Sequence, residues 1–250
     1  MFPLKDNLRC NSFATVTTWL IVVNILAFFA EVGAIVSGNQ AEFFGTFLMV
    51  PHTFFTAIAS GDPLSILSVT GTVFASMFLH GSFGHIAGNM FFLYVFGKAV
   101  ENRLGKWNYL TFYLATGIMA ALCHAFSEPT SMIPTLGASG AIAGVLGGYL
   151  LLWPTATISG FYIAPAPAYV QTKAYWFLVG WFVMQISGVL ESIGSVSGGG
   201  VALWAHIGGF VGGFIIAGLV KIAVPVTDVC IIPVPDCKTP EVDAKKGKKK

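Results

Sequence analysis

Residues 137–153 of the chain read GASGAIAGVLGGYLLLW, a stretch that contains no charged side chain. Its length approaches the roughly 20 residues that a helix needs to cross a hydrocarbon core about 30 Å thick. Glycine, alanine or serine occupies seven of its first eight positions. Small residues let helix backbones approach closely in lipid, where packing drives helix association. The stretch therefore indicates a membrane helix that packs closely against another helix.

Apolar stretches of this kind recur along the whole sequence. The chain has 250 residues, of which 55% are hydrophobic and only 10% are charged, whereas soluble domains carry about 25% charged residues. We expect spanning helices at about residues 13–36, 84–102, 107–126, 136–153, 175–190 and 201–224. The first run exceeds the roughly 7 to 15 apolar residues of a signal peptide, so we interpret it as a spanning helix. The predicted fold class is an all-α membrane protein with six transmembrane helices.

These helices form one predicted membrane domain, residues 13–224. Residues 1–12 form a cytoplasmic N-terminus, and residues 225–250 form a cytoplasmic, lysine-rich tail that we expect to be disordered. Apolar runs alternate with proline and glycine over residues 37–79, which predicts short membrane-interfacial pieces in a first outer loop. The connection at residues 154–172 contains three prolines and is predicted to be irregular.

The basic residues predict how the chain is oriented, because cytoplasmic flanks retain lysine and arginine. With six spans, all 13 basic residues fall at or near one side of the membrane. The other side carries Glu42, Asp62, Glu128 and Glu191 and no basic residue. We therefore predict a multi-pass protein of the cell membrane with both termini in the cytoplasm. Its lysine cluster is either a solvated tail or is attracted to anionic lipid.

The sequence contains no motif for a cofactor, a metal ion or nucleic acid. Three of its four cysteines would lie on the reducing side of the membrane and Cys123 within a helix, so no disulfide framework is expected. CxxC, HExxH and phosphate-binding glycine loops are all missing from the sequence. We predict no cofactor, no metal and no nucleic-acid partner, and we leave the oligomeric state open.

Four polar side chains share one depth in three of the predicted helices. Ser139 lies about four residues into the fourth helix, His206 lies about five into the sixth, and His85 and Asn89 lie in the first two turns of the second. At a rise of 1.5 Å per residue, all four lie roughly 3 to 10 Å below the outer helix ends. Each of them alone could serve packing or knit helices together. Polar groups inside a spanning helix are costly, however, so the set is a functional candidate.

The residue types in this set suit acyl transfer. A serine within hydrogen-bond reach of a histidine is an activated nucleophile. His85 and Asn89 are four residues apart, so they project from one helix face and can donate hydrogen bonds to an oxyanion. The amide of Ser139, close to a helix start, would add another donor. Small residues at four-residue spacing would let the fourth and sixth helices meet: Gly140, Gly144, Ala205, Gly209 and Gly213.

Four motifs occur in a fixed order between Phe78 and Gly218. They are HGSFGHIAGN at residues 80–89, Gly97-x-x-x-Glu101-x-x-x-Gly105, GASG at residues 137–140, and Ala205-His206-x-x-Gly209-x-x-x-Gly213. In this order they resemble the rhomboid family of intramembrane serine proteases. The resemblance implies a six-helix rhomboid-like bundle.

The resemblance also implies roles for individual residues. Ser139 would be the nucleophile, His206 the general base, and His85 and Asn89 the residues that stabilise the oxyanion. It implies structural roles for His80, Gly137, Gly140 and Gly209 near the site, and for Glu101 and Arg103 at the cytoplasmic end.

The chain departs from the family pattern in two places. The family's Trp-Arg pair is missing from the first outer loop. Four residues after the serine, where several members carry an aromatic ring that stacks on the catalytic histidine, this chain has Ala143. The ring of His206 must then be held in another way, or less firmly. No acidic residue lies at the depth of His206, which fits a Ser-His dyad rather than a triad.

The expected function is that of an intramembrane serine endopeptidase that acts on transmembrane protein substrates among membrane lipids. Substrates would arrive beside the fifth helix, whose aromatic residues form a gate or simply pack: Trp176, Phe177, Trp181 and Phe182. Two alternatives stay open. One is a catalytically silent rhomboid-like protein that binds transmembrane clients. The other is a small channel or transporter that uses His85, Asn89 and His206, although the polar residues stop in the outer half of the membrane.

Overall fold

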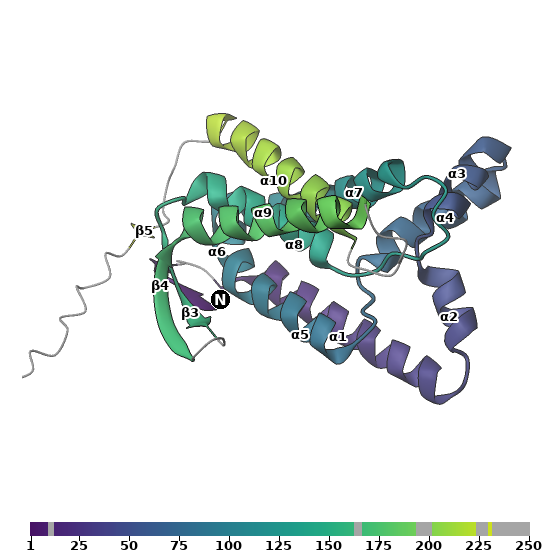
Figure 1. Ribbon diagram of the computed structural model, residues 1–250, viewed down its shortest axis with the longest axis horizontal. Helices are drawn as coiled ribbons and strands as arrows, with labels where there is room; N and C mark the ends of the chain where they lie inside the picture. Colours follow the sequence, from purple (N-terminus) through teal and green to yellow (C-terminus); the bar gives the residue numbers. More distant parts are fainter. Residues whose placement is uncertain (10–12, 163–166, 194–201, 224–229, 232–250) are drawn as a thin grey trace, which may run out of the picture.

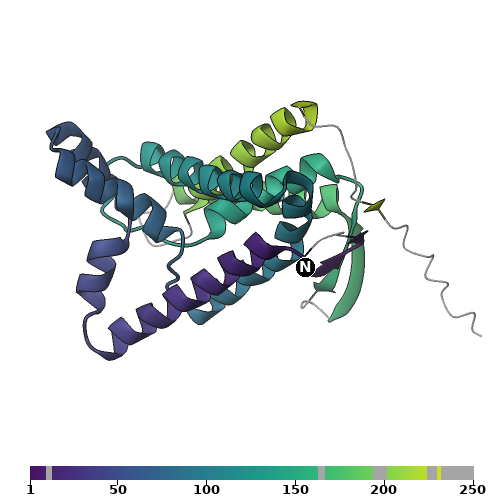
Figure 2. The ribbon, with the colours of Figure 1, turned by 180° about the vertical axis from the view of Figure 1, so that it is seen from behind.

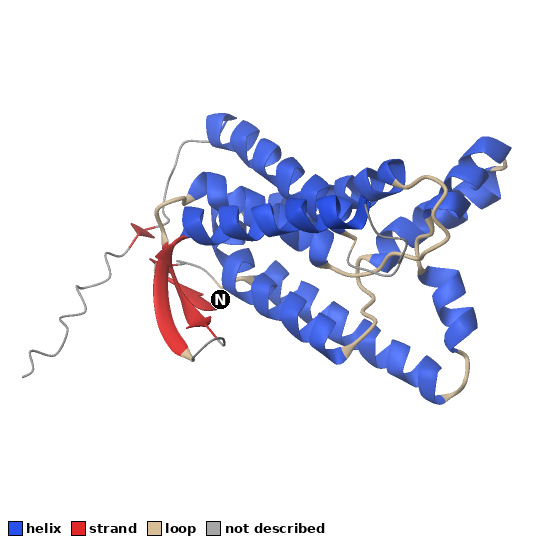
Figure 3. Cartoon of the chain, viewed as in Figure 1, coloured by secondary structure: helices blue, strands red, loops and turns tan. Residues whose placement is uncertain are grey.

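The computed structural model describes residues 1–9, 13–162, 167–193, 202–223 and 230–231. It is mostly helical, with a small sheet at one end (Figures 1 and 3). The helices are α1 (Thr15–Val36), α2 (Gln40–Phe47), α3 (Pro51–Ser60), α4 (Pro63–Ser76), α5 (Phe83–Phe92), the π-helical turn η1 (Leu93–Gly97), α6 (Lys98–Leu104), α7 (Lys106–Ser127), α8 (Ser139–Leu152), α9 (Ala174–Ile193) and α10 (Leu203–Ala223). The strands are β1 (Phe2–Asp6), β2 (Leu8–Arg9), β3 (Thr157–Tyr162), β4 (Ala168–Lys173) and β5 (Cys230–Ile231).

Helical structure occupies each of the six stretches predicted to span the membrane. α5, η1 and α6 together form one run over the second stretch. Within the described part of the chain, three helices are long and apolar enough to cross a membrane by length and composition, namely α1, α7 and α10. The positions of the helices are thus as predicted, and the number of six membrane crossings stays a prediction.

α1 turns its polar residues toward the protein. Thr17, Asn24 and Glu31 recur every seven residues and are buried, whereas Trp19 and Phe29 are 63% and 66% exposed. An amphipathic helix of a water-soluble protein has the opposite arrangement. The outward apolar face suits contact with lipid, and the inward polar face suits contact with the other helices.

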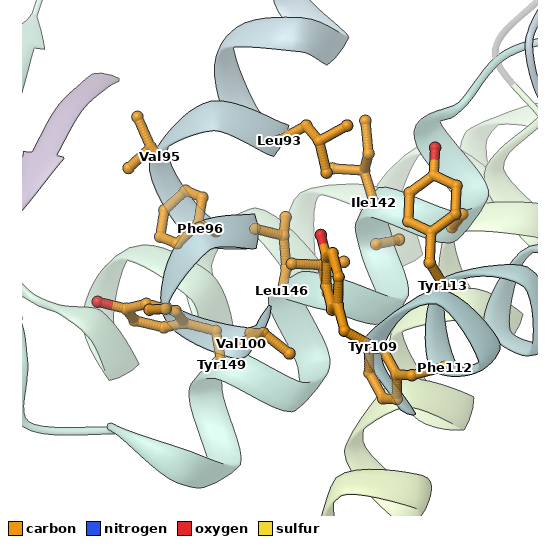
Figure 4. Packing of buried hydrophobic residues seen from close by; sticks show 14 of the residues in the cluster. Leu93, Val95, Phe96, Val100, Tyr109, Phe112, Tyr113, Ile142, Leu146 and Tyr149 are labelled. Atoms are coloured by element: carbon orange, nitrogen blue, oxygen red, sulfur yellow. The ribbon is translucent and has the colours of Figure 1, made fainter. Parts of the chain in front are cut away.

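α8 lies at the centre of the bundle, and every residue from Gly140 to Tyr149 is buried. Figure 4 shows apolar side chains of η1 and α7 meeting those of α8. Among these, Phe96 packs edge-on against Tyr149 with 5.0 Å between ring centroids. The buried core therefore surrounds the helix whose first residue is Ser139.

Glycines bring α8 and α10 into backbone contact. A Cβ atom on Gly209 would overlap the carbonyl oxygen of Gly140, and one on Gly213 would overlap that of Gly144. Only residues without a side chain allow helices to approach this closely. The small-residue contact predicted between these helices is confirmed, and it fixes how far apart the two helices stand near their N-termini.

The prediction of an all-α protein was wrong in one respect, because β1, β3 and β4 form an antiparallel sheet in that order. The connection at residues 154–172, predicted to be irregular, contains the hairpin of β3 and β4. β-branched and aromatic residues, among them Ile158, Tyr169 and Val170, favour these strands. Pro154 and Pro167 lie outside them, where a missing N–H does not interrupt the ladder.

The sheet is tied to the helical core by a side-chain contact. The hydroxyl of Tyr149 on α8 donates a hydrogen bond to Oδ2 of Asp6 on β1 at 2.9 Å. Burial raises the pKa of the Asp6 carboxyl, while the hydrogen bond from Tyr149 and the charge of Lys98 act in the opposite direction. Residues 1–12, predicted only as a cytoplasmic N-terminus, thus contribute a strand that is anchored to the bundle.

The segment between α1 and α5 consists of the three short helices α2, α3 and α4, which lie at the end of the molecule away from the sheet (Figure 2). Asp62 caps α4 by accepting a hydrogen bond from the Ser65 N–H at 2.8 Å. Short helical pieces were predicted here, and their placement in the headgroup region stays a prediction. Most of the predicted tail, residues 225–250, lies outside the described residues, apart from β5, which pairs with β2.

Candidate active site

Ser139 is the first residue of α8, not the fourth residue of that helix as predicted. Gly137 precedes it with a φ of +124°, a backbone conformation that favours glycine. The Gly137 N–H donates to the carbonyl oxygen of Ser76 at 2.8 Å, which holds this turn against the end of α4. The turn delays the helix start to Ser139. At this position the backbone N–H has no partner within the helix and can donate to a ligand.

His206 lies in the first turn of α10 and is 8% exposed. Its Nε2 atom lies 2.8 Å from Oγ of Ser139. At this distance the two atoms form a hydrogen bond, and its length is within the range that a general base needs to take the hydroxyl proton. The close contact between α8 and α10 therefore brings together the two residues predicted to form the catalytic pair.

Two residues of α9 border the ring of His206. The amide oxygen of Gln185 lies 2.8 Å from Nδ1 of His206, and the ring of Trp181 lies 5.8 Å from the imidazole, centroid to centroid. Gln185 was not predicted as a site residue. It is nevertheless a polar side chain within a predicted span, so the criterion that selected the other candidates would also have selected it.

The aromatic residues of α9, considered in advance as a gate, differ in their surroundings. Trp181 and Phe182 stack on Phe210 of α10, and Phe177 stacks near Phe92 and Phe96. Trp176, in contrast, is 67% exposed. Three of the four rings thus pack within the bundle, and Trp176 faces outward.

The ring of His85 borders the same space as the hydroxyl of Ser139. A Cβ atom on Gly137 would lie 2.9 Å from Nε2 of His85 and 3.4 Å from Oγ of Ser139. The backbone N–H of His85 donates to the Ser82 hydroxyl at 3.2 Å, which caps α5 and sets where the helix begins. Gly137 is therefore needed for steric reasons, because any side chain there would displace the imidazole.

Asn89 follows His85 one turn along α5 and is buried, with 8% of its surface exposed. Its Nδ2 has no hydrogen-bond partner within the described part of the chain. Most buried donors in folded proteins are paired, so an unpaired one suggests a role with a ligand. Across the described residues, no hydrogen bond joins Asn89 directly to Ser139 or His206.

His80 is held from α1. Its backbone N–H donates to Oε1 of Glu31 at 2.8 Å, and its ring packs edge-on against that of His85 at 5.1 Å between centroids. Both Glu31 and His80 are 1% exposed. These contacts agree with the structural role that the family resemblance implies for His80. They also explain Glu31, for which the sequence suggested no role, as the anchor of the segment that leads into α5.

We expect Glu31→Leu to lower the thermal stability of the protein in detergent micelles. The change leaves the buried His80 N–H without an acceptor, which costs about 1 to 3 kcal/mol. Glu31→Gln is the matched control, because its amide oxygen can still accept this hydrogen bond. Equal melting temperatures for the two variants would contradict the assignment.

Glu101 of α6 contacts the N-terminal end of α1, which fits the structural role that the family resemblance implies for it. Its two carboxylate oxygens accept hydrogen bonds from the backbone N–H groups of Val16 and Thr17, at 2.8 Å and 2.7 Å. Because the first N–H groups of a helix have no helical partner, the carboxylate satisfies two of them. Glu101 thus anchors the N-terminus of α1 to α6.

A small cavity of about 40 Å³ lies beside Ser139 and is lined mainly by alanine and glycine, together with Ser76 and Thr135. It has room for water next to the nucleophile, since one water needs roughly 10 to 15 Å³. Elsewhere within the described ranges, no three His, Cys, Asp or Glu side chains gather closely enough to hold a metal ion.

Comparisons with known proteins identify the family that the chain resembles. Residues 69–222 match the family model described as the Rhomboid domain. Rhomboid-like protein 11, chloroplastic, of Arabidopsis thaliana is 31% identical over 56% of this chain and 43% of its own length. Rhomboid protease GluP of Bacillus subtilis is 31% identical over 56% of this chain and 24% of its own length. Rhomboid protease AarA of Providencia stuartii is 27% identical over 92% of this chain and 82% of its own length.

The chain covers less than half the length of the first two of these relatives. The match to the family model nevertheless extends over more than half of the chain. It includes Ser139 and His206 as well as His85 and Asn89. The chain therefore belongs to the rhomboid family.

Proposed function

We propose that this protein is an intramembrane serine endopeptidase that hydrolyses peptide bonds in or near transmembrane segments of membrane proteins. The observation that carries the proposal is the 2.8 Å contact between Oγ of Ser139 and Nε2 of His206. A hydroxyl paired with an imidazole is an activated nucleophile. Two of the relatives are named rhomboid proteases, which supports the same chemistry.

In the proposed mechanism, Oγ of Ser139 attacks the scissile carbonyl carbon while Nε2 of His206 takes the hydroxyl proton. The Ser139 N–H, the His85 ring and the Asn89 amide donate hydrogen bonds to the resulting oxyanion. The C–N bond then breaks as His206 returns the proton to the leaving amine. Water from the adjacent cavity attacks the acyl ester, His206 takes one of its protons, and the acid product leaves as Ser139 regains its hydrogen.

We further propose six membrane crossings with both termini on the cytoplasmic side. The arrangement of charges supports this topology, since the basic residues gather on one side under it. The exposed apolar surface of α1 also supports it. No cofactor takes part in the proposed reaction, and the partners are transmembrane substrates and the surrounding lipid.

The proposal is tested with the purified protein in lipid vesicles, together with a model transmembrane substrate that carries a different tag at each end. We expect two products whose masses place the cut within or next to the transmembrane segment. We also expect a fluorophosphonate probe to modify Ser139. Retention of an intact, bound substrate would instead favour a silent client-binding protein, and solute flux without cleavage would favour a channel.

His85→Leu and Asn89→Leu test the proposed oxyanion donors. Loss of one such donor lowers turnover by about 100- to 1000-fold. We expect kcat to fall in each variant, with little change in KM, when cleavage is measured in vesicles. Asn108→Leu is a suitable control, because the Asn108 amide donates to the Leu104 carbonyl one turn earlier in the chain, and among the described residues it makes no hydrogen bond to Ser139, His206, His85 or Asn89. A rise in KM with kcat unchanged would point to a role in substrate contact instead.

A further inference from the structure

His206 must present a particular nitrogen as the base if it is to act on Ser139. The ring contacts Ser139 through Nε2, so Nε2 has to be free of its proton to accept the hydroxyl hydrogen. A neutral imidazole then carries its proton on Nδ1, and that N–H needs an acceptor. The position that bears a stacking aromatic ring in several family members is Ala143 in this chain, so α8 supplies neither an acceptor nor a ring there.

The acceptor comes from α9. Oε1 of Gln185 lies 2.8 Å from Nδ1 of His206. An amide oxygen can only accept a hydrogen bond, so Nδ1 must be the donor. This contact therefore selects the tautomer that leaves Nε2 free.

The contact at the other end of the Gln185 amide favours the same orientation. Nε2 of Gln185 donates to the backbone carbonyl oxygen of Trp181, one turn earlier on α9, at 3.4 Å. A carbonyl can only accept, so the amide nitrogen belongs on this side and the oxygen faces His206. In the reversed amide, the NH2 group would face Nδ1 of His206. Nδ1 would then have to accept a hydrogen bond, so the ring proton would lie on Nε2, which could no longer take the Ser139 proton.

The complete chain of contacts runs in one direction. The Ser139 hydroxyl donates to His206, His206 donates to Gln185, and Gln185 donates to the Trp181 carbonyl. Each of the three hydrogen bonds joins one donor to one acceptor, so no two donors face each other along the chain of contacts. The ring of Trp181 also lies beside the imidazole at 5.8 Å. One turn of α9 thus supplies both the acceptor and the neighbouring ring.

We propose that Gln185 is the positioning residue of the catalytic base: its amide oxygen holds the Nδ1 proton of His206 and so keeps Nε2 available to Ser139. The proposal rests on the Ser139–His206 pair that we assign to catalysis under the proposed function. Gln185 is uncharged, so it orients the imidazole without the electrostatic support that a carboxylate gives to the protonated ring. It fills the place of the acidic member of a triad with a neutral acceptor.

The first test measures the tautomer and does not depend on activity. Nitrogen-15 spectra of histidine-labelled protein in lipid, at a pH where the ring is neutral, report which ring nitrogen carries the proton. His206→Ala identifies the signals of His206 among the five histidines. We expect a protonated Nδ1 in the wild type and a mixture of both tautomers in Gln185→Leu. An Nε2 proton in the wild type, or unchanged populations in Gln185→Leu, overturns the proposal.

The second test measures kinetics on the same samples. Gln185→Leu should lower kcat by about 10- to 100-fold with KM little changed, which is less than the roughly 10,000-fold loss caused by a wrong tautomer in a triad enzyme. Gln185→Glu keeps an acceptor and should restore most of kcat. Ser187→Ala on the same helix is the control, because the Ser187 hydroxyl donates to the Val183 carbonyl and, within the described part of the chain, forms no hydrogen bond with His206.

The two tests separate the two possible failures. If the wild type cleaves no substrate, the proposed function fails, and the nitrogen spectra still decide whether Gln185 sets the tautomer. If the wild type cleaves by way of Ser139 and Gln185→Leu retains full kcat, the positioning role fails and the proposed function stands.

Discussion

Ser139→Ala is expected to lower the rate of substrate cleavage by at least about 1000-fold, because the variant has no hydroxyl to form the acyl intermediate. His206→Ala should cause a loss of similar size, since the two residues act in one step. The double variant should be no worse than either single one, as expected for residues that act as a unit. Product formation in vesicles, measured by mass spectrometry over long incubations, gives the residual rates.

Ser127→Ala is the matched control for the loss of a hydroxyl. The Ser127 hydroxyl donates to the Cys123 carbonyl within its own helix, α7, and it should be dispensable. Melting temperatures of all variants in micelles must stay close to that of the wild type, so that lost activity reflects lost chemistry. Cleavage by Ser139→Ala at a rate near that of the wild type would show that another group is the nucleophile.

Gly209→Ala is expected to lower both the stability and the activity of the protein. The new Cβ would overlap the carbonyl oxygen of Gly140, so α8 and α10 would have to separate. Overpacking of this kind costs about 1 to 3 kcal/mol. The separation also lengthens the contact between Ser139 and His206, and a displacement of about 1 Å can lower a rate by about 100-fold. Both a lower melting temperature and a lower kcat are therefore expected.

Gly33→Ala is a control that is expected to leave the melting temperature unchanged or to raise it slightly. A Cβ atom on Gly33 in α1 would have no atom within 4 Å. Alanine is favoured over glycine inside a helix by up to about 1 kcal/mol. This variant should therefore melt at the same temperature as the wild type or slightly higher. If Gly209→Ala behaved in the same way, the close contact between α8 and α10 would not be needed for stability.

Much of the helical arrangement could be predicted because its signals are local. Hydropathy located a helix at each of the six stretches, and the spacing of Gly140 and Gly144 indicated a close helix contact. The start of α8 was harder to predict, because leucine and alanine before Ser139 are ordinary helix residues. Only the left-handed backbone of Gly137 ends the preceding turn there, and glycine occurs at many other positions in this chain.

The parts that could not be predicted depend on contacts between distant segments. The strand β1 finds its partner about 155 residues later along the chain, and no local pattern joins the two segments. The contact between Gln185 and His206 requires two helices to face each other in a particular rotation. Glu31 and His80 meet in the same way. A single polar residue in an apolar helix indicates that such a contact exists, but the sequence does not show which residue it contacts.

The sheet is joined directly to α9. β4 ends at Lys173 and α9 begins at Ala174, so the strand continues directly into the helix that carries Gln185. β1 is coupled to that helix through β3 and β4. Displacement of β1 by a bulky fusion partner attached at Met1 is therefore expected to reach, through the paired strands, the helix whose Gln185 contacts the imidazole of His206.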